Sequence, residues 1–232
     1  MVKRHIKKAR DLVERRRFRL LLSATLLVLI LPAFFGKGLL NTILFVISLT
    51  FLLIQSMIIA NVNRPSKIWI RSLFIIILIL LYWLDPLGIK SEFLDVAKFF
   101  LLVFAFVAVT YYLFLFLKKS KDVNIDVILV SINIYLLLGI VFGSLSFLFN
   151  ELYNNAYNFP SNLTDPNFTT FVYYSFITMS TVGYGDVTPR IPETQTLAYF
   201  ISVTGQLYVA IIVAFLVGKL LVKGNDSPKK EK

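Results

Sequence analysis

The chain has 232 residues, of which 57% are hydrophobic and 16% charged, and its formal net charge is +11. This composition is typical of a protein with several membrane spans and fits a soluble domain of the same length poorly. The sequence has no cysteine, which excludes disulfides, thiolate chemistry and cysteine-ligated metal sites. Its one histidine, His5, lies in the basic N-terminal segment.

The N-terminal segment, residues 1–17, is rich in Lys and Arg. Ile6, Ala9 and Val13 recur at helical spacing, so a helix here would carry a narrow apolar stripe. Such a helix could lie on the inner leaflet, with its cations among anionic lipid headgroups. A solvated tail that only sets the topology is an equally good interpretation.

Six hydrophobic segments follow, each near the length of about 20 residues that crosses a bilayer. The first is too long for a signal peptide and lacks a small-residue cleavage site, so we expect it to stay in the chain. The predicted spans are residues 18–35, 39–60, 68–84, 93–117, 125–149 and 197–222. The corresponding organisation is a basic segment (1–17), a four-helix bundle (18–117), a short linker (118–124), a pore domain (125–222) and a tail (223–232).

The Lys and Arg residues are unevenly distributed between the two sides of the predicted spans. With both termini in the cytoplasm, the inner segments hold 20 of the 24 basic residues. This asymmetry follows the positive-inside rule and predicts a multi-pass protein of the plasma or inner membrane. It also explains the net charge better than a nucleic-acid partner does, because the cations flank the spans.

The segment between the fifth and sixth spans contains the sequence TVGYGD, which begins at Thr181. Dehydrating a cation in a narrow pore requires carbonyl oxygens that replace its water shell. A run of carbonyls aimed at one axis needs unusual backbone dihedrals, which glycine adopts at little cost. Gly183 and Gly185 alternate here with Val182 and Tyr184, and Thr181 can add its hydroxyl oxygen below the carbonyls.

This sequence resembles the signature of the potassium channel family. The resemblance implies K⁺ ions bound by the backbone oxygens of Thr181, Val182, Gly183 and Tyr184, with Gly185 completing the selectivity filter. A ring around an ion needs about four such loops, so the resemblance also implies a homotetramer. The expected fold is an all-α membrane protein with six transmembrane helices and a re-entrant pore helix and filter between helices five and six. No cofactor is expected other than the K⁺ ions in the filter.

Residues 168–180 are predicted to form the pore helix, whose C-terminal dipole favours a cation in the cavity below the filter. Tyr173 and Tyr174 stand where the family usually has two tryptophans. By that resemblance they support the filter, packing around Tyr184 and hydrogen-bonding near Asp186. An aromatic belt at the membrane interface is the alternative interpretation of the two tyrosines.

Three further glycines and one isoleucine of the predicted pore domain (125–222) can be interpreted from the sequence. Gly205 lies 24 residues after Thr181, the offset at which the family's pore-lining helix carries a gating-hinge glycine. A glycine in a membrane helix can equally be a close-packing site, and both interpretations stay open. Gly139 and Gly143 are interpreted as packing residues only. Ile177 stands where some bacterial relatives carry a glutamate paired with the filter aspartate, so that pair is absent.

The fourth span lacks the regularly spaced cations of voltage-gated relatives. Its only basic residue is Lys98, near the outer end, which can pair with Asp95 three residues earlier. The first four spans therefore resemble a voltage-sensor bundle without gating charges. The linker at 118–124 looks too short for the long helix that lets a sensor reach a neighbouring pore, so we expect a non-swapped tetramer.

These features predict a potassium-selective channel that conducts passively and is weakly or not voltage-gated. The sequence shows no catalytic triad, metal cluster or phosphate loop, so an enzyme is not expected. The alternative is a regulatory or silent subunit that assembles with another potassium channel. A potassium transporter is improbable, because such chains carry several degenerate filter-like loops and this one has a single complete loop.

Overall fold

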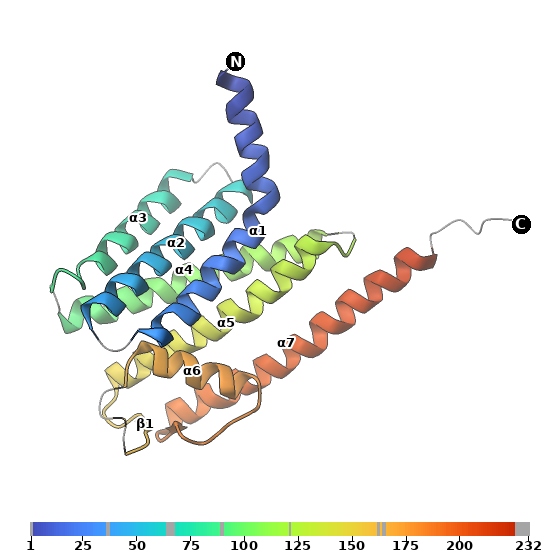
Figure 1. The fold of residues 1–232 in the computed structure, drawn as a ribbon. Coiled ribbons are helices and arrows are strands. Elements are labelled where there is room, and N and C mark those ends of the chain that lie inside the picture. Colours follow the sequence, from blue (N-terminus) through green and yellow to red (C-terminus); the bar gives the residue numbers. More distant parts are fainter. Residues whose placement is uncertain are drawn as a thin grey trace, which may run out of the picture. The chain divides into compact units, whose positions relative to one another are not determined.

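The computed structural model describes residues 2–35, 38–63, 68–88, 91–120, 122–161, 163 and 166–225. These residues form seven helices and two short strands, and Figure 1 labels the helices and the first strand. The chain divides into two compact units, Met1–Tyr112 and Leu113–Lys232, and each is described by itself.

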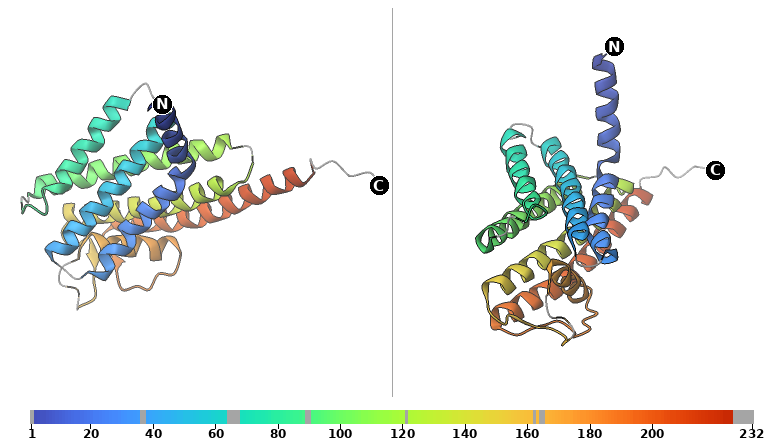
Figure 2. Two further views of the ribbon diagram at one scale, coloured as in Figure 1. Left: turned by 45° about the horizontal axis from the view of Figure 1, so that its top comes forward. Right: turned by 60° about the vertical axis from the view of Figure 1, so that its left-hand side comes forward.

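The first unit holds α1 (Val2–Phe34), α2 (Leu39–Asn63), α3 (Ile68–Trp83) and most of α4 (Glu92–Lys119). Helix α2 packs against both α1 and α3, and both views in Figure 2 show it between them. Leu21 on α1 and Leu49, Leu52 and Leu53 on α2 are fully buried. The apolar side chains that give these helices their hydropathy therefore also form the core of this unit.

Helix α1 joins the basic N-terminal segment to the first hydrophobic stretch without a break. Pro32 lies inside its last turn and the helix ends at Phe34, as expected for a residue that cannot continue the helical hydrogen-bond ladder. The basic segment is thus helical, which the interpretation as a helix on the inner leaflet requires. Its apolar stripe falls on side chains outside the described residues.

Four helical segments in the described part of the chain are long and apolar enough to cross a membrane. They are Leu39–Ile59, Val96–Lys119, Ile125–Leu152 and Pro192–Lys219. Helix α3 is apolar but has 16 residues, a length of about 24 Å at 1.5 Å per residue, against a hydrocarbon core of about 30 Å. Neither α1 nor α3 is among the four segments, so the first and third predicted spans stay predictions.

The second unit contains α5 (Ile125–Leu152), α6 (Phe168–Met179), α7 (Pro192–Asn225) and an antiparallel pair of strands, β1 (Tyr157–Asn158) and β2 (Thr188–Pro189). Asn124 caps α5 by accepting a hydrogen bond from the Val127 N–H at 3.0 Å, and Asn167 forms a capping box with Thr170 at the start of α6. Helix α6 packs against both α5 and α7. The helix predicted at 168–180 is therefore present.

Helix α7 begins five residues before the predicted sixth span, which started at 197. Pro192 occupies its first position and Glu193 lies in its first turn, where a fixed φ and a negative charge both favour a helix N-terminus. Residues 192–196 are mostly polar, so the apolar run in the sequence starts only after them. Thr194 Oγ1 ties this end to the loop after α5 by donating to the Ala156 carbonyl at 2.9 Å.

Candidate functional site: the Thr181–Asp186 loop

The segment after α6 has an alternating backbone. Thr181, Gly183 and Gly185 have φ values of +62°, +53° and +78°, in the left-handed region, whereas Val182 and Tyr184 between them have no positive φ. Glycine adopts this region at no steric cost. When left-handed and right-handed backbone dihedrals alternate along a chain, successive C=O groups can point to the same side. Such a run can present a row of carbonyl oxygens to a cation.

Thr181 is the one residue of the three that has a side chain. A β-branched residue rarely adopts positive φ. Such a conformation costs about 1–3 kcal/mol of strain and persists only where the surrounding structure holds it. Its N–H donates to the Thr178 carbonyl at 3.1 Å, and its hydroxyl donates to the Ser180 carbonyl at 2.6 Å. These bonds hold the chain in the turn that starts the loop.

The C-terminal end of α6 anchors the loop. The last carbonyls of a helix have no partner within the helix and need one outside it. The Ile177 carbonyl accepts from the N–H groups of both Val182 and Gly183, at 2.9 and 3.1 Å. Ile177 lacks the carboxylate of the bacterial pattern, but its backbone oxygen holds the first residues of the loop in place.

The outer end of the loop is held by Asp186. Its Oδ2 accepts a hydrogen bond from the Tyr173 hydroxyl at 2.8 Å, and its Oδ1 accepts one from the Val187 N–H at 3.0 Å. The bond to the carboxylate raises the pKa of the Tyr173 hydroxyl above its ordinary value. The phenol is protonated at neutral pH and can donate this bond there.

The two predicted support tyrosines have different surroundings. Tyr173 is 40% exposed and contacts Asp186, whereas Tyr174 is 3% exposed, with its ring 5.3 Å from that of Tyr157. Tyr157, Tyr174 and Phe171 belong to the buried core of this unit. Tyr184 is 72% exposed within one chain, so packing of both tyrosines around it would need a second chain and stays a prediction.

Replacing Tyr173 by phenylalanine removes the hydroxyl that binds Asp186 and keeps the ring. If the loop is the selectivity filter that the resemblance implies, its conducting state should lose about 1 kcal/mol, or a factor of about five in its lifetime, because the bond is charge-assisted but solvent-exposed. Single-channel open times measure this effect. Tyr153→Phe, in the turn after α5, is the control, and open times equally short in both variants would contradict the assignment.

Gln206 is a contact of the loop that the sequence analysis did not identify. Its Nε2 donates to Thr181 Oγ1 at 3.2 Å, from the position on α7 that follows Gly205. The Thr181 hydroxyl, predicted as an oxygen ligand, is therefore oriented by α7 as well as by its own loop. The one amide side chain within the predicted span 197–222 was the signal available in the sequence.

Three glycines let α6 approach its neighbours closely. A Cβ on Gly139 would lie 2.5 Å from the Phe176 ring atom Cε1, and one on Gly143 would lie 2.8 Å from the Val172 Cα. The Ser175 hydroxyl also donates to the Gly139 carbonyl at 2.6 Å. The packing interpretation of these two glycines on α5 is thus confirmed.

Gly205 faces the last residue of α6 from the other side. A Cβ at this position would overlap the Met179 carbonyl oxygen and lie 2.8 Å from the Met179 carbonyl carbon. This contact favours the close-packing interpretation of Gly205. Helix α7 is continuous from Pro192 to Asn225, and a hinge at Gly205 stays a prediction.

The apolar helices define an α-helical membrane protein, and the loop with its supports lies in the second unit. Residues 130–222 match the family model described as "Ion channel", a range that includes α6, the loop and all but the last residues of α7. This part of the chain is therefore similar to an ion channel domain. No curated protein and no solved structure matches the chain.

Proposed function

We propose that the protein is a potassium-selective channel of the cell membrane, built from four copies of the chain around one pore. The observation that carries the proposal is the alternating backbone of Thr181, Gly183 and Gly185 within the TVGYGD sequence. Carbonyl oxygens of Thr181–Tyr184 would replace the hydration shell of K⁺. In this proposal the chain has six spans with both termini cytoplasmic, α6 and the loop enter the membrane from outside, and ions pass without catalysis.

The exposure of the loop supports the assembly. Val182 and Tyr184 are exposed within one chain, as are Val203, Leu207 and Ile211 on α7. Irregular backbone cannot face hydrocarbon, because its polar groups would have no partner there. At membrane depth the loop must therefore line water or pack against protein, and a ring of about four loops provides both.

Reconstitution of the purified protein tests this function. We expect a homotetramer by cross-linking and mass measurement, and a flux into liposomes that K⁺ carries and Na⁺ does not. Equal K⁺ and Na⁺ currents would overturn the proposal. A homotetramer that forms but passes no ions would instead favour the regulatory or silent subunit.

The first unit supports weak voltage dependence. Lys98 is 3% exposed, and its Nζ forms an ion pair with the Asp85 carboxylate and lies 5.8 Å from the ring centre of Tyr82. The partner predicted from the sequence, Asp95, has a side chain outside the described residues. Because Lys98 is buried and paired with a residue after α3, moving it would break the pair inside the protein.

We therefore expect open probability to change only shallowly with voltage. One elementary charge that crosses the field gains about 2.3 kcal/mol per 100 mV, and steep gating needs several such charges per subunit. Currents recorded in symmetric potassium between about −100 and +100 mV, a range worth about 4.6 kcal/mol per charge, test this expectation. A steep activation curve that flattens in Lys98→Gln would show that this residue carries gating charge.

A further inference from the structure

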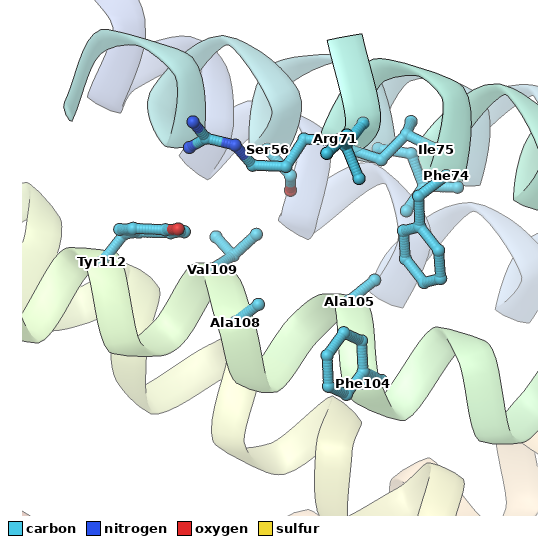
Figure 3. Close-up of a pocket in the computed structure, with 11 residues that line it drawn as sticks. Ser56, Arg71, Phe74, Ile75, Phe104, Ala105, Ala108, Val109 and Tyr112 are labelled. Atoms are coloured by element: carbon cyan, nitrogen blue, oxygen red, sulfur yellow. The ribbon is translucent and has the colours of Figure 1, made fainter. Parts of the chain in front are cut away.

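The first unit contains a cavity between α2, α3 and α4. Its volume is about 380 Å³, within the range of about 300–1,000 Å³ found for small-molecule sites. Figure 3 shows the rings of Phe74 and Phe104 at one end and the guanidinium of Arg71 near the ring of Tyr112 at the other. The cavity thus has an apolar end and a cationic end.

Three polar side chains line this cavity, those of Ser56, Arg71 and Tyr112. The Ser56 hydroxyl is buried, with the residue 1% exposed, and has no hydrogen-bond partner among the described residues. A buried hydroxyl without a partner is unfavourable, and such a group calls for a ligand or an ordered water. In Figure 3 the Ser56 oxygen lies on the side of the cavity that faces Ala105 and Val109 of α4.

Arg71 supplies the charge. It is the fourth residue of α3, and its guanidinium carbon lies 5.9 Å from the centre of the Tyr112 ring on α4. A cation over an aromatic face is held in place electrostatically. Arginine is also the side chain best suited to bind a phosphate group, because its planar set of N–H donors matches the phosphate oxygens.

We propose that this cavity binds an anionic phospholipid, with one acyl chain among Phe74, Ile75 and Phe104 and the phosphate at Arg71. The Ser56 hydroxyl would then donate to an ester carbonyl of the lipid, which gives this buried donor a partner. A zwitterionic lipid carries its own cation beside the phosphate, so the Arg71 charge should favour the anionic headgroup. The inference rests on membrane location and does not require potassium selectivity.

Fluorescence quenching by brominated lipid tests the proposal. The chain has two tryptophans, Trp69 and Trp83, both on α3. Replacing both by phenylalanine and introducing Phe74→Trp places a single reporter in the cavity wall. The full-length protein is reconstituted in phosphatidylcholine vesicles that contain a low mole fraction of brominated phosphatidylglycerol or of brominated phosphatidylcholine.

We expect saturable quenching that prefers the brominated phosphatidylglycerol by about tenfold, the effect of one charge-assisted hydrogen bond. Arg71→Gln should remove this preference, and Ala108→Leu should abolish quenching by filling the cavity. Lys118→Gln is the matched control, since it removes an exposed cation of α4 that does not line the cavity, and it should preserve the preference. The emission spectrum without brominated lipid shows whether each variant is folded.

Equal quenching by the two lipids, or an anionic preference that survives in Arg71→Gln, would overturn the proposal. Saturable quenching by a brominated fatty acid without quenching by the phospholipid would assign the cavity to a different ligand and would also overturn it. Potassium flux measured on the same vesicles separates this outcome from the proposed function. Flux without lipid preference contradicts only the lipid site, and lipid preference without flux contradicts only the channel.

Discussion

Alanine at Gly183 or Gly185 is expected to abolish selective potassium conduction. A Cβ added at either residue has no neighbour within 4 Å in the chain, so steric overlap within one chain is not the reason. The reason is the backbone, because φ is +53° at Gly183 and +78° at Gly185. A residue with a Cβ pays about 1–2 kcal/mol in this region, and about four loops in one ring would raise the cost to about 4–8 kcal/mol.

Reversal potentials in mixed potassium and sodium solutions measure this effect. Gly88→Ala is a matched control, because Gly88 has φ +76° and equally open space but lies in the turn after α3. This substitution should cost a similar backbone strain and leave ion selectivity unchanged. If Gly183→Ala and Gly185→Ala both keep potassium selectivity, the alternating backbone is not what selects the ion.

The loop itself was predictable from the sequence, because its expected conformation needs backbone dihedrals that glycine adopts most easily. Glycine at two alternate positions has few explanations other than positive φ, and both glycines have it. The short helix predicted at 168–180, directly before the filter sequence, is present as Phe168–Met179. Where a local sequence decides the backbone, the structure agrees with the prediction.

The contacts between elements were predicted only in part, since the resemblance implied that both support tyrosines hydrogen-bond near Asp186 and one of them does. Tyr173 and Tyr174 are neighbours in sequence, yet one binds Asp186 and the other is buried, because adjacent residues on a helix point about 100° apart. The bond from Gln206 to Thr181 joins residues 25 apart and depends on how α7 meets the loop. Such pairs follow from tertiary packing, which the order of residues alone does not determine.

The start of α7 shows a third kind of difference. Hydropathy placed the sixth span at 197, whereas Pro192 begins the helix and β2 ends at Pro189 directly before it. Arg190 also donates its N–H to the Ala156 carbonyl at 2.9 Å, which holds this turn against the loop after α5. Membrane hydropathy finds the part of a helix that meets lipid, and capping determines where the helix begins.

Alanine at Gly205 should destabilise the folded pore domain as well as reduce the current. The added Cβ would overlap the carbonyl oxygen of Met179 and lie 2.5 Å from Met179 Cγ. Alanine gains about 1 kcal/mol of helix propensity over glycine, but overpacking costs about 1–3 kcal/mol and here opposes backbone atoms that cannot rotate away. The cost of the steric overlap should therefore exceed the gain in helix propensity, and the C-terminal end of α6 should move.

Movement of Met179 would reach the Thr181–Asp186 loop within a few residues, since the Ile177 carbonyl holds the N–H groups of Val182 and Gly183. We expect Gly205→Ala to lower the thermal midpoint of the purified channel and the potassium flux together. Gly218→Ala, on the same helix, where the chain leaves open space for a Cβ, is the control and should leave the thermal midpoint unchanged or higher. If Gly205→Ala instead folds with an unchanged midpoint and alters only open probability, the residue acts as a hinge and its contact with Met179 is not what requires glycine.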